Sequence, residues 1–267
     1  MNCKPALKAA LLCLFGVCMP VFAHADVKVA VAANFKPTIV TLIDEYTRMH
    51  PKADIRVSSA STGVLYAQIN RGAPFDIFLS ADSDRPKRLE KSGLVEANTR
   101  KNYALGQLVL WRKGFSSVNA DSLNTLTGKL AIANPKLAPF GLAAKQAMQK
   151  LGKYTALQSR IVLGNNVSQT AHYVKSGAAE AGFVALSQVI QRSGQSKDYW
   201  LLPSHLYSPI NQQMVVIKQS GRPEHETQEV MAFHHFILSD AGQSIITKSG
   251  YQSSKMQSIP RVKPDVQ

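Results

Sequence analysis

The sequence predicts an α/β protein of two lobes, each built on a mainly parallel sheet, with strands that cross between the lobes. Short β-type runs alternate with segments of helical periodicity along the chain. The alternation falls into two blocks, residues 26–105 and 106–209, after which the chain returns to helices. No Ser/Gly linker separates the blocks, which favours crossing strands over two independent domains. With 267 residues and 45% hydrophobic content, the chain can bury a core of this size.

The first block contains three strand–helix units. Pro37 suits the first turn of the first helix, and Gly93 stops the third. The predicted strands are residues 27–32, 55–59 and 76–80, and the predicted helices are residues 37–50, 64–70 and 85–92.

The second block continues the alternation, and two helices close the chain. Its predicted strands are residues 103–111, 129–133, 161–163 and 181–185, and its helices are residues 142–151, 168–176 and 187–192. A strand at residues 212–218 and helices at residues 224–238 and 241–249 follow. Lobe 1 is therefore predicted to comprise residues 26–105 plus 210–267, and lobe 2 residues 106–209.

The N-terminus has the pattern of a secretory signal peptide. Lys4 and Lys8 precede an apolar run, and Ala23-His24-Ala25 offers small residues before a cleavage point. Residues 1–25 are thus predicted to be removed after Ala25, so the mature chain is expected to be exported. All three cysteines lie within this segment, so we expect no disulfide, thiol nucleophile or cysteine metal site in the mature chain.

Charge and motifs exclude several function classes. The formal net charge of +14 is spread over basic residues with acids between them, without the aromatic interleaving that nucleic-acid binding favours. Nucleophile-elbow, zinc-protease, phosphate-loop and dinucleotide motifs are absent, which argues against an enzyme. The adjacent His234 and His235 would point about 100° apart on a helix, so no metal cation site is expected. Asp82 and Asp84 are interpreted as caps of the helix that begins near Arg85.

Four turns between a strand and a helix share one arrangement. They hold Ala33-Asn34, Ser61-Thr62-Gly63, Pro139-Phe140-Gly141 and Asn166-Val167-Ser168. Ligands of open α/β sheets lie beyond the carboxyl ends of strands, and each helix start carries unpaired N–H groups and a partial positive charge. Four such ends together would suit a small dianion without any lysine or arginine. Each turn taken alone is better explained by ordinary helix capping, and only the recurrence of the arrangement in both blocks favours a binding site.

The donor chemistry of these turns discriminates between anions. Backbone N–H, hydroxyl and carboxamide groups donate to a fully ionised oxyanion, whereas hydrogen phosphate keeps a proton that needs an acceptor. None of the four turns contains Asp or Glu. A sulfate-like or molybdate-like ion is therefore favoured over phosphate as the ligand. The alternative from another functional class is an exported hydrolase that uses Ser or Asp residues at strand ends.

Several motifs resemble the periplasmic molybdate-binding proteins, the substrate-binding components of ABC importers. These motifs are Val29-Ala30-Val31-Ala32-Ala33-Asn34-Phe35, Ser61-Thr62-Gly63-Val64-Leu65-Tyr66-Ala67-Gln68-Ile69, Gly72-Ala73-Pro74-Phe75-Asp76-Ile77-Phe78-Leu79-Ser80-Ala81-Asp82, Asn134-Pro135-Lys136-Leu137-Ala138-Pro139-Phe140-Gly141, Asn165-Asn166-Val167 and Gly182-Phe183-Val184-Ala185. The resemblance implies a type II periplasmic binding protein fold that closes on molybdate or tungstate. It further implies a monomer without a cofactor, whose partner is a membrane permease. A sulfate-binding protein of the same fold remains the alternative.

The resemblance also implies a set of ligand-binding residues. Asn34 takes the place of a side-chain donor, and Thr62, with Ser61 beside it, falls where the family has a ligand-binding serine. Phe140 and Val167 fall at positions whose backbone N–H binds the ion. Ala185 is a departure, because some members place a ligand-contacting tyrosine there and its hydroxyl is absent from this chain.

Overall fold

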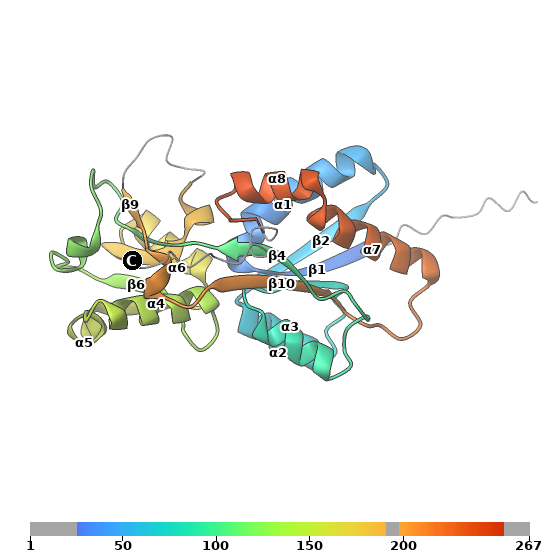
Figure 1. Ribbon diagram of the computed structural model, residues 1–267, viewed down its shortest axis with the longest axis horizontal. Helices are drawn as coiled ribbons and strands as arrows, with labels where there is room; N and C mark the ends of the chain where they lie inside the picture. Colours follow the sequence, from blue (N-terminus) through green and yellow to red (C-terminus); the bar gives the residue numbers. More distant parts are fainter. Residues whose placement is uncertain (1–25, 191–197, 254–267) are drawn as a thin grey trace, which may run out of the picture.

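The computed structural model describes residues 26–190 and 198–253, which form two five-stranded sheets flanked by helices (Figure 1). The predicted signal peptide lies outside the described residues. The strands are β1 Asp26–Ala32, β2 Asp54–Ala60, β3 Ile77–Leu79, β4 Lys101–Gly106, β5 Leu108–Trp111, β6 Leu130–Ala133, β7 Ile161–Gly164, β8 Ala181–Ala185, β9 Tyr199–Leu201 and β10 Ile210–Val216. The α-helices are α1 Lys36–Met49, α2 Thr62–Asn70, α3 Asp84–Lys91, α4 Pro139–Lys150, α5 Tyr154–Leu157, α6 Val167–Ser176, α7 Glu224–Leu238 and α8 Asp240–Lys248.

The first sheet has the strand order β2-β1-β3-β10-β4. Its first three strands are parallel, and β10 and β4 add antiparallel pairs. Helices α1, α7 and α8 cover one face with a core that includes Phe35 and Phe233, and α2 and α3 cover the other with Leu65 and Leu89 (Figure 1). The apolar runs seen in the sequence are explained by this burial on both faces.

The second sheet has the order β7-β6-β8-β5-β9, with parallel pairs at β6 and antiparallel pairs at β5. One continuous cluster of buried residues, which includes Met148 of α4 and Val174 of α6, packs against it. The predicted α/β architecture with two sheets and crossing strands is confirmed, and each sheet is mixed because the crossing strands add antiparallel pairs to a parallel centre.

The crossing strands explain the largest difference from the predicted elements. The run at residues 103–111 is two strands, because β4 belongs to the first sheet and β5 to the second, with Gln107 between them. The chain returns between β9 and β10. Strand β9 was not predicted. Of the helix expected at residues 187–192, the described residues contain the short 3-10 turn η4, Leu186–Gln188, and residues 191–197 lie outside them.

Parallel register aligns the strand ends that lead into the four turns. In the first sheet Ala32 at the end of β1 lies opposite Ala60 at the end of β2, and in the second Ala133 of β6 lies opposite Gly164 of β7. β1 continues into the 3-10 turn η1, Ala33–Phe35, while β2, β6 and β7 lead to α2, α4 and α6. No described helix is both long and apolar enough to cross a membrane.

Candidate functional site

The four turns meet around one small cavity between the two sheets. Its volume is about 10 Å³, close to the minimum that admits a single water-sized group, so only a compact ligand suits it. The cavity is lined by Ala32, Ala33, Asn34, Ser61, Thr62, Ala81, Ala138, Pro139, Phe140, Asn166 and Val167. All five residues predicted to bind an oxyanion, Asn34, Ser61, Thr62, Phe140 and Val167, therefore lie together at this cavity.

Two hydroxyl groups from the start of α2 are available at the cavity. Ser61 occupies the N-cap position, yet its side chain makes no capping hydrogen bond. Its Oγ is buried and has no hydrogen-bond partner among the described residues. Thr62 Oγ1 accepts the backbone N–H of Ala81 at 3.1 Å, which leaves its own proton available to donate. Ordinary capping therefore does not explain Ser61.

Two further helix starts supply backbone donors. Pro139 occupies the first position of α4, three residues earlier than the sequence predicted, and this places the N–H of Phe140 in the first turn. Val167 opens α6, and Asn166 caps that helix by accepting the N–H of Gln169 at 3.0 Å. First-turn N–H groups have no acceptor within their own helix, so those of Phe140 and Val167 are free to bind an anion.

In the turn that contains Asn34, the side chain makes contacts that the sequence did not predict. Asn34 Nδ2 donates to Gln212 Oε1 at 2.8 Å and to the hydroxyl of Tyr251 at 3.1 Å, so both of its protons are engaged. The donor that Asn34 offers to the cavity without breaking these bonds is its backbone N–H, in the first turn of η1. Sequence reasoning missed Gln212 and Tyr251. The sequence does contain an indication for Gln212, because a polar residue within a buried strand needs a hydrogen-bond partner.

Contacts between the turns hold the two halves against one another. The N–H of Gly63 donates to Leu137 O at 2.9 Å, and Ser168 Oγ donates to Ala33 O at 2.9 Å. A Cβ at position 63 would lie 3.1 Å from Leu137 O, so this close approach favours glycine. The cavity thus lies between two halves that contact one another.

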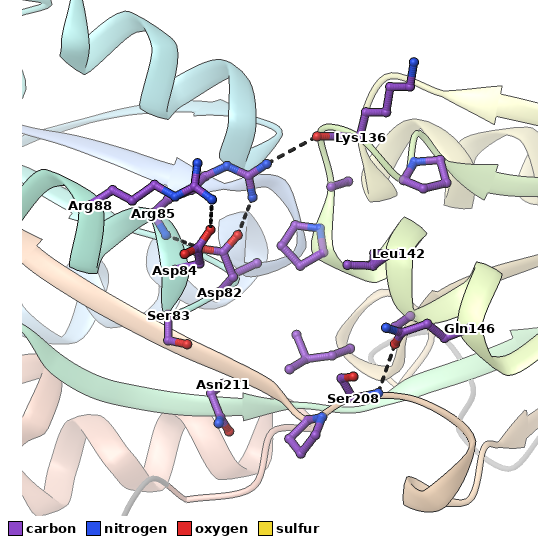
Figure 2. Close-up of a pocket in the computed structure, with 17 residues that line it drawn as sticks. Asp82, Ser83, Asp84, Arg85, Arg88, Lys136, Leu142, Gln146, Ser208 and Asn211 are labelled. Atoms are coloured by element: carbon purple, nitrogen blue, oxygen red, sulfur yellow. Dashed lines mark hydrogen bonds and ion pairs between the residues drawn. The ribbon is translucent and has the colours of Figure 1, made fainter.

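A larger cavity of about 350 Å³ adjoins the small one and shares Ala81, Ala138 and Pro139 with it. Both carboxylates in its lining form ion pairs, Asp82 with Arg85, and Asp84 with Arg88 at 2.7 Å, while the lining also includes Lys136 (Figure 2). Asp82 Oδ1 also accepts the N–H of Arg85 at 3.0 Å in the first turn of α3, as predicted, whereas Asp84 is the first residue of α3 and pairs with Arg88 instead of capping the helix. Because these carboxylates are engaged in salt bridges, they are poor candidates for acid–base catalysis.

The small cavity itself is electrically neutral. No Asp, Glu, Lys, Arg or His lines it, and no group of three or more His, Cys, Asp or Glu that could hold a metal ion occurs within the described part of the chain. Burial raises the pKa of Tyr251 and of Tyr103 far above the usual value, so both hydroxyls near Asn34 stay protonated. The cavity offers uncharged donors only.

Comparisons of sequence and of structure both find molybdate-binding proteins among the proteins similar to this chain. Residues 27–252 match the family described as bacterial extracellular solute-binding protein. The molybdate-binding protein ModA of Rhodobacter capsulatus is 37% identical over 91% of this chain and 94% of its own length. ModA of Azotobacter vinelandii is 41% identical over 85% of this chain and 90% of its own. The solved periplasmic molybdate-binding protein of Azotobacter vinelandii superposes with a TM-score of 0.78 at 36% identity, covering 85% of this chain and 98% of that structure.

Proposed function

This chain belongs to the family of bacterial extracellular solute-binding proteins, and from that membership we propose that it binds molybdate, and tungstate with it, between its two sheets. The observation that carries the proposal is the cavity where four turns present uncharged donors, including the unpartnered buried Oγ of Ser61. A buried hydroxyl without a partner costs free energy unless a ligand satisfies it.

The ligand-binding set in this proposal is Ser61, Thr62 and the backbone N–H groups of Asn34, Phe140 and Val167. Hydroxyl and N–H donors that converge on a dianion make charge-assisted hydrogen bonds, which are about twice as strong as neutral ones. Hydrogen phosphate would need an acceptor for its proton, and no carboxylate lines the cavity. The proposed site therefore prefers fully ionised oxyanions.

Binding without catalysis is the activity that this chemistry supports. A serine or threonine nucleophile needs an adjacent base, and no histidine, lysine or carboxylate lines the cavity beside Ser61 or Thr62. In the proposed role the protein works as a periplasmic monomer that delivers its ion to an ABC importer permease. In this proposal the lobes keep the boundaries predicted from the sequence, residues 26–105 plus 210–267 and residues 106–209, and the chain is exported behind a signal peptide that ends at Ala25.

The direct test is a thermal melt with molybdate, tungstate, sulfate or phosphate. A ligand at about 100 times its dissociation constant stabilises the folded state by roughly 2.7 kcal/mol, which for a chain of this size raises the melting temperature by about 5–10 °C. We expect this shift with molybdate and tungstate. A shift with sulfate alone would make the protein a sulfate binder, and no shift with any of these oxyanions would refute the proposal.

A proline substitution tests the backbone donors. Val167→Pro removes the N–H at the first position of α6, where proline is tolerated, and the preceding Asn166 has the extended conformation that proline favours. We expect the dissociation constant for molybdate, measured by calorimetry, to rise about 10- to 100-fold. Glu224→Pro, at the same position of α7, is the matched control and should leave it unchanged. Equal affinity in both variants would exclude the Val167 N–H as a ligand.

A further inference from the structure

The carbonyl oxygen of Asn34 collects donors from both halves of the molecule. Ser187 Oγ lies 3.1 Å from it and Gln188 Nε2 3.2 Å, and both residues belong to η4, which follows β8 of the second sheet. The hydroxyl of Tyr251, which packs in the core of the first sheet, lies 2.8 Å from the same oxygen. A residue that lines the cavity is thus also a junction between the halves.

Three of these groups form a closed ring of hydrogen bonds. Asn34 Nδ2 donates to the Tyr251 hydroxyl at 3.1 Å, that hydroxyl lies 2.9 Å from Ser187 Oγ, and Ser187 Oγ donates to Asn34 O. When the Tyr251 proton points to Ser187 rather than to Asn34 O, each hydroxyl donates once and accepts once, and Gln188 uses the second lone pair of the carbonyl. The three ring residues are at most 3% exposed, so the ring is shielded from water.

Neighbouring contacts fix the turn that carries Asn34. Gln212 Oε1 accepts the other Nδ2 proton of Asn34, and the hydroxyl of Tyr103 donates to the same Oε1 at 3.0 Å. The ring of Phe35 packs edge-on against Tyr251, with centroids 5.2 Å apart. The orientation of the Asn34 peptide is therefore set by buried groups that do not themselves line the cavity.

We propose that Tyr251 and Ser187 are positioning residues for the oxyanion cavity. Their side chains hold the Asn34 turn against the second half of the molecule. Retention of the ligand therefore depends on closure of the two halves, and closure depends on the ligand. This inference rests on the proposed function. The ring can form only when the halves are together, because Ser187 lies in η4 after β8 of the second sheet and Asn34 lies in η1 after β1 of the first. Loss of the ring should therefore speed ligand release, whereas capture by the open form should change little.

The test compares Tyr251→Phe, Ser187→Ala and their combination. Tyr207→Phe is the matched control, since the Tyr207 hydroxyl is also buried and bonded, to the N–H of Leu108 at 3.2 Å. Calorimetry gives the dissociation constant for molybdate, and stopped-flow tryptophan fluorescence gives the two rate constants. We expect each ring variant to bind about tenfold more weakly through a faster off-rate, with the on-rate within about twofold of the unmodified chain.

The combined variant separates positioning from a general loss of stability. Groups in one network are coupled, so the double variant should lose less affinity than the product of the two single losses. The inference is overturned if the single variants keep the dissociation constant of the unmodified chain. It is also overturned if the affinity loss of the double variant equals the product of the two single losses, or if Tyr207→Phe loses as much affinity as the ring variants. The unmodified chain, titrated alongside, reports on the proposed function separately: if it binds molybdate while the ring variants do so equally well, only the positioning role fails.

Discussion

Removal of the Ser61 hydroxyl should change ligand affinity and ligand-free stability in opposite directions. Ser61 Oγ is buried, has no partner among the described residues and does not cap α2. Ser61→Ala therefore removes no hydrogen bond from the ligand-free protein and relieves an unsatisfied polar group. With an oxyanion bound, the same change removes a donor to a charged acceptor.

Both effects have a size that can be measured. A hydrogen bond to a charged group contributes about 1.5–3 kcal/mol, so the dissociation constant for molybdate should rise roughly 10- to 150-fold. Relief of an unsatisfied hydroxyl stabilises by up to about 1–3 kcal/mol. In a domain of this size, each kcal/mol corresponds to roughly 2–4 °C in the melting temperature. The ligand-free melting temperature should therefore stay equal or rise.

Calorimetry with molybdate and ligand-free thermal melts provide the two readouts. Ser122→Ala is the matched control, because the Ser122 hydroxyl forms a capping box with Asn119 far along the chain from the cavity residues. That variant should lose about 1 kcal/mol of stability and keep its affinity. If Ser61→Ala behaves like Ser122→Ala, with a lower melting temperature and unchanged affinity, Ser61 is a structural residue and the reasoning is wrong.

Three other predictions concern packing and pH. A Cβ on Gly141 would lie 2.0 Å from Ala133 O, so Gly141→Ala should displace the start of α4, lowering both the melting temperature and molybdate affinity; retention of both would contradict the packing. Burial lowers the pKa of His234, so the unfolded chain binds more protons below about pH 6.5 and stability falls as the pH drops. His234→Gln, which keeps a donor toward Thr99 O, should flatten the dependence of the unfolding free energy on pH, measured with urea, and an unaltered slope would exclude His234 as its source. Molybdate affinity should be flat from about pH 6 to about pH 8.5, because no Asp, Glu, Lys, Arg or His lines the cavity, and a titration step within that range would point to an unrecognised ionisable ligand.

The strand–helix alternation was readable in advance because it depends on local patterns. Strand β6 is an unbroken apolar run, β1 alternates between apolar and polar residues at its start, and Pro37 marks the first turn of α1. The run at residues 103–111 shows the limit of such patterns. It is apolar in both halves, and nothing local indicates that Gln107 separates strands of two different sheets.

The site could be predicted only as four candidate turns. Capping and ligand binding use the same residue types, so the sequence could not separate Ser61, which leaves α2 uncapped, from Asn166, which caps α6. The distinction depends on where each side chain points and what lies within hydrogen-bond distance. Tyr251 lies 217 residues from Asn34 along the chain, and no periodicity links them.

The amino-acid sequence by itself determined the α/β class, the order of the elements and the donor-only character of the turns, because propensity, hydrophobic period and side-chain chemistry act over a few residues. The tertiary structure alone decided that the turns converge on one cavity. It also decided that the side chain of Asn34 is hydrogen-bonded to Gln212 and Tyr251, because such contacts depend on how distant segments pack together.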